Sequence, residues 1–213
     1  MSLRIHFTDR AYLKTFFIGL FFILLSVVFQ FFASTYANLR ASASVEDIVL
    51  SNTRVYDVDC IFVYGSVLIF VFIISLCLAR PRYFPFAMKT IALFTFIRSI
   101  FVTLTHISPF PGHVMIESAF FADKMFRGIF TGDDLFFSGH TGIPFLMALM
   151  FWDNKPLRYI FLIWSLVFAS VVLLGHLHYS IDVLSAFFIT YSIYHIACFL
   201  FKRDLKLFSG AQA

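Results

Sequence analysis

The chain has 213 residues, of which 61% are hydrophobic, 20% are aromatic and only 13% are charged, and its formal net charge is +4. Soluble domains carry roughly 25% charged residues, and a soluble globule of this size cannot bury so much apolar surface. A disordered chain is excluded as well, because disordered chains are poor in aromatic residues. The composition is therefore that of a polytopic membrane protein. Its three cysteines do not form a disulfide framework.

Runs of apolar residues with few charges mark the candidate membrane spans in chain order. We predict helices here, because the bilayer offers no water to unpaired backbone groups. The six predicted spans cover residues 15–38, 61–78, 90–105, 135–152, 159–177 and 183–201. No repeat or low-complexity stretch interrupts them. The expected fold is thus an all-α, six-helix membrane domain that comprises residues 1–213.

The basic residues are distributed unevenly among the loops between these spans. Eleven of the sixteen Lys and Arg residues lie in the two tails, in the loop between spans two and three, and in the turn between spans four and five. The positive-inside rule then predicts that both termini are cytoplasmic. The acidic loops at residues 41–59 and 106–134, and the short turn at residues 178–182, are expected on the other side.

Two polar clusters lie at the ends of predicted spans, and the topology places both on the non-cytoplasmic side. The first runs from Asp134 to Thr141 and contains Ser138, Gly139 and His140. A Ser-Gly pair at a helix N-terminus offers N–H groups, a hydroxyl and a favourable dipole to a phosphate. The histidine would then project from the first helical turn, where it can exchange protons.

The second cluster contains His176, His178, Tyr179 and Asp182. On a helix His178 and Asp182 would share a face, and the carboxylate would hold one imidazole nitrogen protonated while the other stays nucleophilic. Arg98, inside the third predicted span, is suited to binding phosphate oxygens. Two histidines, one aspartate, one arginine and a helix start together indicate phosphoryl transfer through a phosphohistidine.

Each cluster also has a structural interpretation, because short Ser-Gly-His and His-x-x-x-Asp patterns occur by chance. A His-Asp pair can seal a helix bundle in a scaffold or transporter without catalysing anything. His176 could join His178 in a metal site, but two-residue spacing splays helical side chains, so we expect a satisfied polar residue. His106 and His113 are expected at the membrane interface, and His6 and His195 lie toward the cytoplasm.

Taken together, these residues resemble the sphingomyelin synthase family, a branch of the type 2 phosphatidic acid phosphatase superfamily. Asp134-x-x-x-Ser-Gly-His-Thr141 is similar to that branch's Gly-Asp-x3-Ser-Gly-His-Thr motif from the aspartate onward. His178-Tyr-Ser-Ile-Asp-Val183, with Phe187 following, resembles its His-Tyr-(Ser/Thr)-x-Asp-(Val/Ile)-x3-aromatic motif. Arg98 and Thr105 resemble an Arg-x6-Thr element in the third span.

The resemblance implies roles for the matching residues. His178 would attack phosphorus with Asp182 as its partner, His140 would be the acid and base, and Ser138, Gly139 and Arg98 would hold phosphate oxygens. Asp134, Tyr179 and Asp47 would recognise the head group or support the site. The implied partners are membrane lipids, a phospholipid donor and a lipid alcohol acceptor. No cofactor, metal or nucleic acid is expected, and the oligomeric state is left open.

The sequence also departs from the family pattern. Gly132-Asp133 replaces the family's Cys-Gly, and residues 43–47 keep only the aspartate of its Pro-Pro-Leu-Pro-Asp element. The phosphatase branch fits less well, because its Ser-Arg-x5-His element would require Ser and Arg at Val171 and Val172. Two functions therefore stay open: transfer of a phosphocholine-type or phosphoethanolamine-type head group to a ceramide-like or other lipid alcohol, and hydrolysis of a lipid phosphate with water as acceptor.

Overall fold

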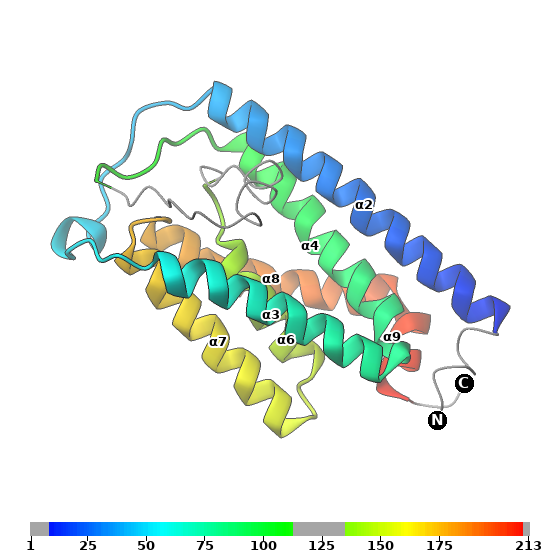
Figure 1. Cartoon of the computed structure of the whole chain (residues 1–213). Helices are drawn as coiled ribbons and strands as arrows, with labels where there is room; N and C mark the ends of the chain where they lie inside the picture. The colour runs from blue at the N-terminus through cyan, green and yellow to red at the C-terminus, as the bar shows by residue number, and fades with distance from the viewer. Residues whose placement is uncertain (1–8, 113–134, 211–213) are drawn as a thin grey trace.

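The computed structural model of the protein describes residues 9–112 and 135–210, and all regular secondary structure in these two ranges is helical. In chain order the elements are α2 (Arg10–Leu39), η1 (Leu50–Asn52), α3 (Asp59–Ala79), η2 (Pro81–Tyr83), α4 (Phe84–Leu104), α6 (Gly139–Met150), α7 (Lys155–Leu174), α8 (Ser180–Leu200) and α9 (Lys202–Ser209). Figure 1 shows α2 and α4 running side by side, with α3, α6, α7 and α8 completing the bundle. The predicted all-α fold is confirmed for this part of the chain.

Five helical segments in the described ranges are long and apolar enough to cross a membrane: Arg10–Leu39, Asp59–Ala79, Pro81–Leu104, Lys155–Leu174 and Ser180–Leu200. They correspond to the first, second, third, fifth and sixth predicted spans. The third begins earlier than predicted, because Pro85 fits a first helical turn and the helix continues through Lys89. The fifth ends at Leu174, so the predicted stretch to residue 177 is wrong: the chain turns at Gly175.

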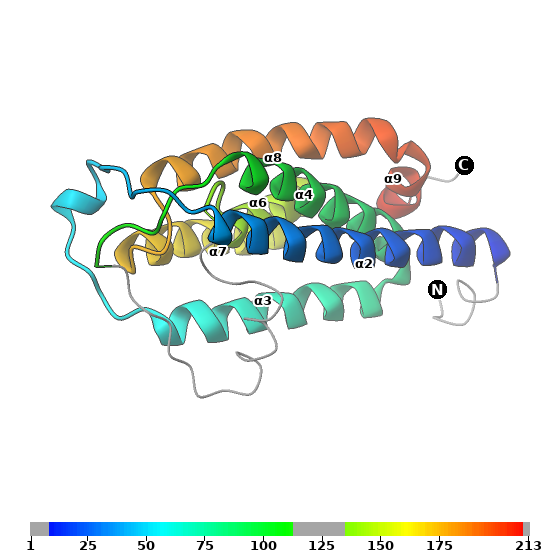
Figure 2. The same cartoon turned by 90° about the horizontal axis from the view of Figure 1, so that it is seen from above.

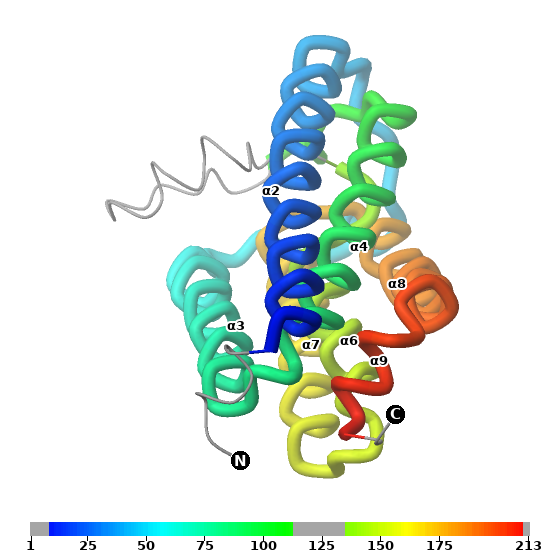
Figure 3. Tube along the Cα trace, turned by 90° about the vertical axis from the view of Figure 1, so that its right-hand side faces the viewer, coloured from blue at the N-terminus to red at the C-terminus, as the bar shows by residue number. Residues whose placement is uncertain are grey.

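The fourth predicted span, residues 135–152, is wrong in length. α6 begins only at Gly139 and has 12 residues, a length of about 18 Å against the roughly 30 Å of a bilayer core. Its residues Leu146, Met147 and Ala148 are fully buried, and α6 lies among α4, α7 and α8 near the centre of the bundle (Figure 3). The apolar sequence of α6 therefore reflects burial in protein.

The contact between α2 and α4 is close and partly polar. The Gln30 side chain is fully buried, donates to Ser34 Oγ at 2.9 Å and accepts from Ser99 Oγ at 3.0 Å. Ala33 and Ala37 pack with Val102 on the same seam. Small residues let helix backbones approach, and inter-helix hydrogen bonds satisfy the buried amide. This seam fixes α4, which carries Arg98.

At the end of the bundle where the chain ends lie, a buried polar triangle joins three helices. Lys89 Nζ lies 2.6 Å from Asp204 Oδ2 and donates to Thr15 Oγ1 at 2.6 Å, and Thr15 in turn donates to Asp204 Oδ1 at 2.6 Å. The sequence had placed Lys89 in a loop, which is wrong: it lies in α4 and is buried against α9. The triangle ties the start of α2 to the C-terminal helix.

The opposite end carries residues 40–58 and the starts of α6 and α8. Figure 2 shows residues 40–58 and the start of α8 toward one end of the bundle, with α9 and the start of α2 at the other, and α3 running on its own side away from α8. Ser42 N and Oγ both donate to His106 O, at 2.7 and 2.5 Å, so the two loops that follow α2 and α4 are tied together. The predicted convergence of the two polar clusters on one end is confirmed.

Candidate active site

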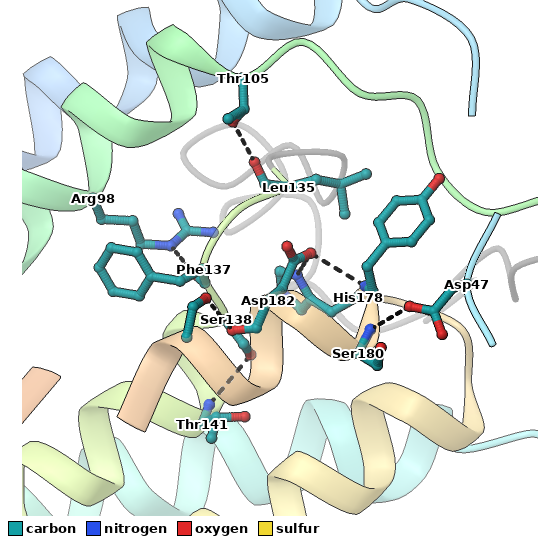
Figure 4. A network of polar contacts seen from close by, with 12 residues as sticks. Asp47, Arg98, Thr105, Leu135, Phe137, Ser138, Thr141, His178, Ser180 and Asp182 are labelled. Carbon is teal, nitrogen blue, oxygen red and sulfur yellow. Dashed lines mark hydrogen bonds and ion pairs between the residues drawn. The ribbon is translucent and has the colours of Figure 1, made fainter. Parts of the chain in front are cut away.

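The segment that leads into α6 is held by Arg98 of α4 and by Thr105, the C-cap residue of that helix. Thr105 Oγ1 lies within hydrogen-bonding distance of two carbonyl oxygens, Leu135 O at 3.2 Å and Phe101 O of α4 at 2.9 Å, and Arg98 Nε donates to Phe137 O at 3.0 Å (Figure 4). Arg98 and the C-cap Thr105 are seven residues apart, about two helical turns, so both lie on the same side of α4. The carbonyls that they bind lie two residues apart in the chain. α4 thereby sets the position at which α6 begins, and we call this pair of contacts the α4 clamp.

Between the two clamped carbonyls lies Phe136, whose φ is 84°. A bulky residue in the left-handed region is strained, by about 1–3 kcal/mol, and such strain persists only where the surroundings impose it. The α4 clamp on either side supplies that constraint, and the Phe136 ring also meets Phe101 at 5.6 Å between centroids. No sequence signal points to this conformation, because aromatic residues rarely adopt it.

The start of α6 has the form that the sequence predicts. Ser138 is the N-cap, fully buried, and its Oγ accepts from Thr141 N at 3.4 Å. Gly139 is the first helical residue, and a Cβ placed on it would lie 3.5 Å from Arg98 Nε. The guanidinium therefore lies beside the positive end of the helix dipole, with only a glycine between them. Together they form a compact positive region that suits an anion.

At the start of α8, one carboxylate oxygen organises the second histidine. Asp182 Oδ2 lies 3.2 Å from His178 Nδ1 and accepts from Tyr179 N at 3.1 Å (Figure 4). The sequence predicted this pair on one helical face, which is wrong for His178: α8 begins at Ser180, and the histidine precedes it. The contact forms across the helix start, with Asp182 capping the chain that carries the imidazole. Both side chains are buried.

A backbone hydrogen bond joins the two motifs. Ser138 N donates to Asp182 O at 3.1 Å, so the N-cap of α6 touches the first turn of α8 directly. Residues 44 positions apart in the chain are thus fixed with respect to each other. Asp182 and the Ser138 cap meet at this junction, which brings the His178–Asp182 pair and the start of α6 into one site.

His140 is the second residue of α6 and is half-buried. Its ring packs against Phe62 of α3 at 4.2 Å and Phe168 of α7 at 5.8 Å between ring centroids. The predicted position in the first helical turn is confirmed. Phe62 is a neighbour that the sequence did not single out, since it looks like any other aromatic residue of a span.

The start of α8 also receives a second carboxylate from the loop after α2. Asp47 Oδ2 accepts from Ser180 N at 2.7 Å, while Oδ1 accepts from Val49 N at 2.8 Å and Leu50 N at 3.0 Å. Burial alone would raise the pKa of the Asp47 carboxyl, but these backbone N–H groups outweigh burial and lower that pKa. Of the two roles predicted for Asp47, this geometry favours the supporting one.

The two helix starts consequently differ in what they can bind. Asp182 and Asp47 already occupy N–H groups at the start of α8, whereas the α6 start is lined by Ser138, Gly139 and Arg98. A carboxylate at one helix start repels a second anion there. A phosphate is therefore directed to α6. Asp134, the other predicted supporting residue, lies outside the described residues.

Tyr179 ties the α8 start to both neighbouring loops. Its hydroxyl donates to Ser108 O at 2.8 Å and accepts from Val45 N at 3.3 Å, and its side chain is 2% exposed. The ring meets Phe110 at 6.1 Å between centroids. Tyr179 thus fixes the loops around His178, which fits the supporting role predicted for it.

His176 does not match its prediction as a satisfied polar residue. It is 4% exposed, and within residues 9–112 and 135–210 neither ring nitrogen has a hydrogen-bond partner. A buried polar group without a partner costs about 1–3 kcal/mol, and the φ of 54° adds strain. No group of three His, Cys, Asp or Glu side chains that could hold a metal ion was found among the described residues.

Comparison with known protein families gave a match to part of the chain. Residues 132–198 match the family described as PAP2 superfamily C-terminal. The matched range contains both histidine motifs, from Ser138 to Asp182, and it supports the type 2 phosphatidic acid phosphatase superfamily. The five apolar helices and this match together indicate an integral membrane protein. No match was found among curated proteins or among solved structures.

Proposed function

We propose that the protein is an integral-membrane lipid phosphotransferase that moves a phosphocholine-type or phosphoethanolamine-type head group onto a ceramide-like or other lipid alcohol through a phosphohistidine. One observation carries the proposal. The Ser138 N to Asp182 O hydrogen bond of 3.1 Å joins a cationic helix start to a buried His-Asp pair. A phosphate bound at the first is then adjacent to a nucleophile oriented by the second.

The first half-reaction uses His178 as the nucleophile. Because Nδ1 faces Asp182, the other nitrogen, Nε2, supplies the lone pair that bonds to phosphorus. The bond from phosphorus to the diacylglycerol oxygen breaks, and His140 gives that oxygen its proton. Asp182 balances the positive charge that develops on the imidazole of His178.

The second half-reaction reverses these roles. His140, now neutral, takes the proton of the acceptor hydroxyl, and the resulting oxygen attacks phosphorus. The phosphorus–nitrogen bond breaks and returns the electron pair to His178. In both steps Arg98, Ser138 and the N–H groups at the start of α6 stabilise the non-bridging oxygens, which is where charge gathers in the transition state.

A lipid phosphate phosphatase is the second candidate, because the family match is consistent with a phosphatase as well as with a phosphotransferase. The range that matches PAP2 superfamily C-terminal covers the same two motifs, and water would replace the lipid alcohol without any change in the residues used. The residues described here serve both reactions up to the phosphohistidine. The two candidates differ in the donor, a phosphodiester for the transferase and a phosphomonoester for the phosphatase, and in whether a lipid alcohol or water reaches His140 in the second step.

We further propose that the site faces away from the cytoplasm. η2, the start of α7 and α9 lie toward the end of the bundle opposite the site (Figure 1), and these segments and the residue before η2 include Arg80, Arg82, Arg158, Lys202 and Lys206. By the positive-inside rule this end is cytoplasmic. The lipids of the outer or luminal leaflet would then be the substrates.

The reaction is tested with purified protein in mixed lipid that contains head-group-labelled phosphatidylcholine or phosphatidylethanolamine, with and without ceramide. Label in a new lipid supports the transferase. Phosphate released from phosphatidic acid without any labelled lipid product supports the phosphatase instead. If protein shown to be folded forms neither product, both candidate functions are contradicted.

The histidine roles are tested with His178→Ala and His140→Ala. The first removes the atom that bonds to phosphorus, so no phosphoenzyme forms. The second should slow turnover by roughly 10²–10⁴-fold, yet a p-nitrophenyl phosphodiester, whose leaving group needs no proton, should restore phosphoenzyme formation in it. Acid-labile, base-stable label on His178→Ala but not on His140→Ala would show that the roles are reversed.

A further inference from the structure

His176 is a buried imidazole for which the mechanism above has no use. The residue lies in the turn between α7 and α8, where its backbone N–H donates to Leu173 O at 3.1 Å. Its ring meets Phe110 edge-on at 5.3 Å between centroids. Among the described residues nothing pairs with Nδ1 or Nε2, although the side chain is 4% exposed. Buried polar groups in folded proteins are normally paired, so an unpaired one needs a reason.

Three contacts fix the position of the turn that carries His176. Tyr56 N donates to Leu174 O at 2.9 Å just before the turn, and Tyr179 donates to Ser108 O at 2.8 Å just after it. Phe110 then touches both rings, that of His176 and that of Tyr179. The imidazole is thus held against Phe110, which in turn packs on Tyr179, and it lies two residues from the proposed nucleophile His178.

This position selects one part of the lipid donor. In an in-line displacement the departing and arriving lipid oxygens lie opposite the nucleophile, on the side of His140. The head group stays attached to phosphorus through both steps. Since His176 belongs to the same turn as His178, the head group is the part of the substrate that can meet it.

We propose that His176 hydrogen-bonds the head group of the donor lipid and selects head groups that carry N–H or O–H, an inference that rests on the proposed transferase function. A neutral imidazole offers one donor and one acceptor. An ethanolamine ammonium can donate to its bare nitrogen, and a glycerol hydroxyl can pair with either nitrogen. The trimethylammonium of choline can do neither and would leave the imidazole unpaired.

The size of the preference follows from this lack of partners. Sites built to hydrogen-bond a substrate group reject the analogue that lacks it, by up to about 10⁴–10⁵-fold in the strongest cases. For a single imidazole we expect transfer from phosphatidylethanolamine or phosphatidylglycerol to exceed transfer from phosphatidylcholine by about tenfold or more in kcat/KM. Two donors are compared so that an ammonium and a hydroxyl can be told apart.

The test uses His176→Phe, His176→Asn and His176→Gln in the full-length protein. Phenylalanine removes both hydrogen-bonding atoms, while the Asn and Gln amides lie near the positions of Nδ1 and Nε2. We expect His176→Phe to fold with an unchanged or higher Tm, because an unpaired polar group is replaced by an apolar one. It should lose the head-group preference through the KM of the favoured donor, and at least one amide variant should retain part of it.

His106→Phe is the matched control, since His106 lies at the same end of the bundle and packs against Tyr36. It should keep the wild-type preference. The inference is overturned if the wild type uses phosphatidylcholine as well as the other donors, or if His176→Phe keeps the preference, as it would if a structural water satisfied the ring. Release of phosphate from phosphatidic acid, with no labelled lipid product from any donor, would instead contradict the transferase itself.

Discussion

Replacing Asp182 with asparagine separates the charge of this residue from its geometry. Both side-chain contacts of Asp182 go to one oxygen, Oδ2, which takes His178 Nδ1 and Tyr179 N. An asparagine whose carbonyl occupies that position accepts the same two hydrogen bonds. The third contact, from Ser138 N, goes to the backbone and is unaffected. The variant should therefore fold and hold His178 in place.

The charge matters only once the imidazole becomes positive. Asp182 Oδ2 and His178 Nδ1 lie 3.2 Å apart. At that separation, two opposite unit charges attract each other by about 5 kcal/mol when the effective dielectric constant is about 20. Because an imidazolium spreads its charge over the ring, a mean separation of about 5 Å and about 3 kcal/mol is the lower bound. The expected loss in the rate of phosphoenzyme formation is thus roughly 10²–10⁴-fold.

Single-turnover measurement of labelled phosphohistidine, in wild type and Asp182→Asn, gives this rate directly. Asp47→Asn is the matched control, because it makes the same change at the same helix start. Both oxygens of Asp47 accept backbone N–H groups, so its variant should lose stability and keep the rate in the folded fraction. Loss of less than tenfold in Asp182→Asn, or equal losses in both variants, would refute the charge argument.

Three further predictions follow from contacts of single residues. Gly142→Ala should lower the free energy of unfolding by about 1–3 kcal/mol, because its Cβ would lie 2.7 Å from Phe94. Gly139→Ala, whose Cβ would lie 3.5 Å from Arg98 Nε, should fold normally and lose activity by crowding the bound anion. Thermal melts and turnover in detergent check both variants. The stability that ionised Asp47 provides is present above its ordinary pKa of 3.8 and is lost as pH falls through its lowered folded-state value, so the gap in Tm between wild type and Asp47→Asn should narrow in acid. A cysteine at exposed Ser44, in a background without the native cysteines, should react with an impermeant maleimide on intact cells; labelling only after permeabilisation would reverse the topology.

Sequence alone predicted the parts of this fold that depend on local composition. Long charge-free runs predicted five of the helices, because length and hydropathy decide whether a helix can cross a bilayer. The Ser138 cap and the first-turn position of His140 follow from capping preferences within four residues. The meeting of the two motifs followed from counting spans, although α6, with 12 residues, is shorter than the span predicted there.

Features that depend on residues far apart in the chain were not accessible in this way. Asp204 lies in the charged C-terminal segment, and nothing near it in the sequence indicates a buried partner in Lys89. His178 was predicted on the helix because i and i+4 spacing suggests it, whereas α8 begins only at Ser180, two residues later, where Asp47 accepts the Ser180 N–H. His176 was expected to be satisfied, since sequence says nothing about which partners a fold provides.

The α4 clamp is the clearest of these long-range features, and it yields the last prediction. Thr105→Val keeps the side-chain shape and removes the hydroxyl, which lies 3.2 Å from Leu135 O and 2.9 Å from Phe101 O, a loss of about 0.5–1.5 kcal/mol. With one of its two restraints gone, Phe136 can relax from its left-handed conformation, so the stability lost should be partly regained. Activity should still fall by up to about tenfold, because the start of α6 is no longer held beside Arg98. Thr103→Val is the control: its hydroxyl donates within α4, to Ser99 O, and should leave turnover unchanged. Equal turnover in the two variants would mean that the clamp does not position the site.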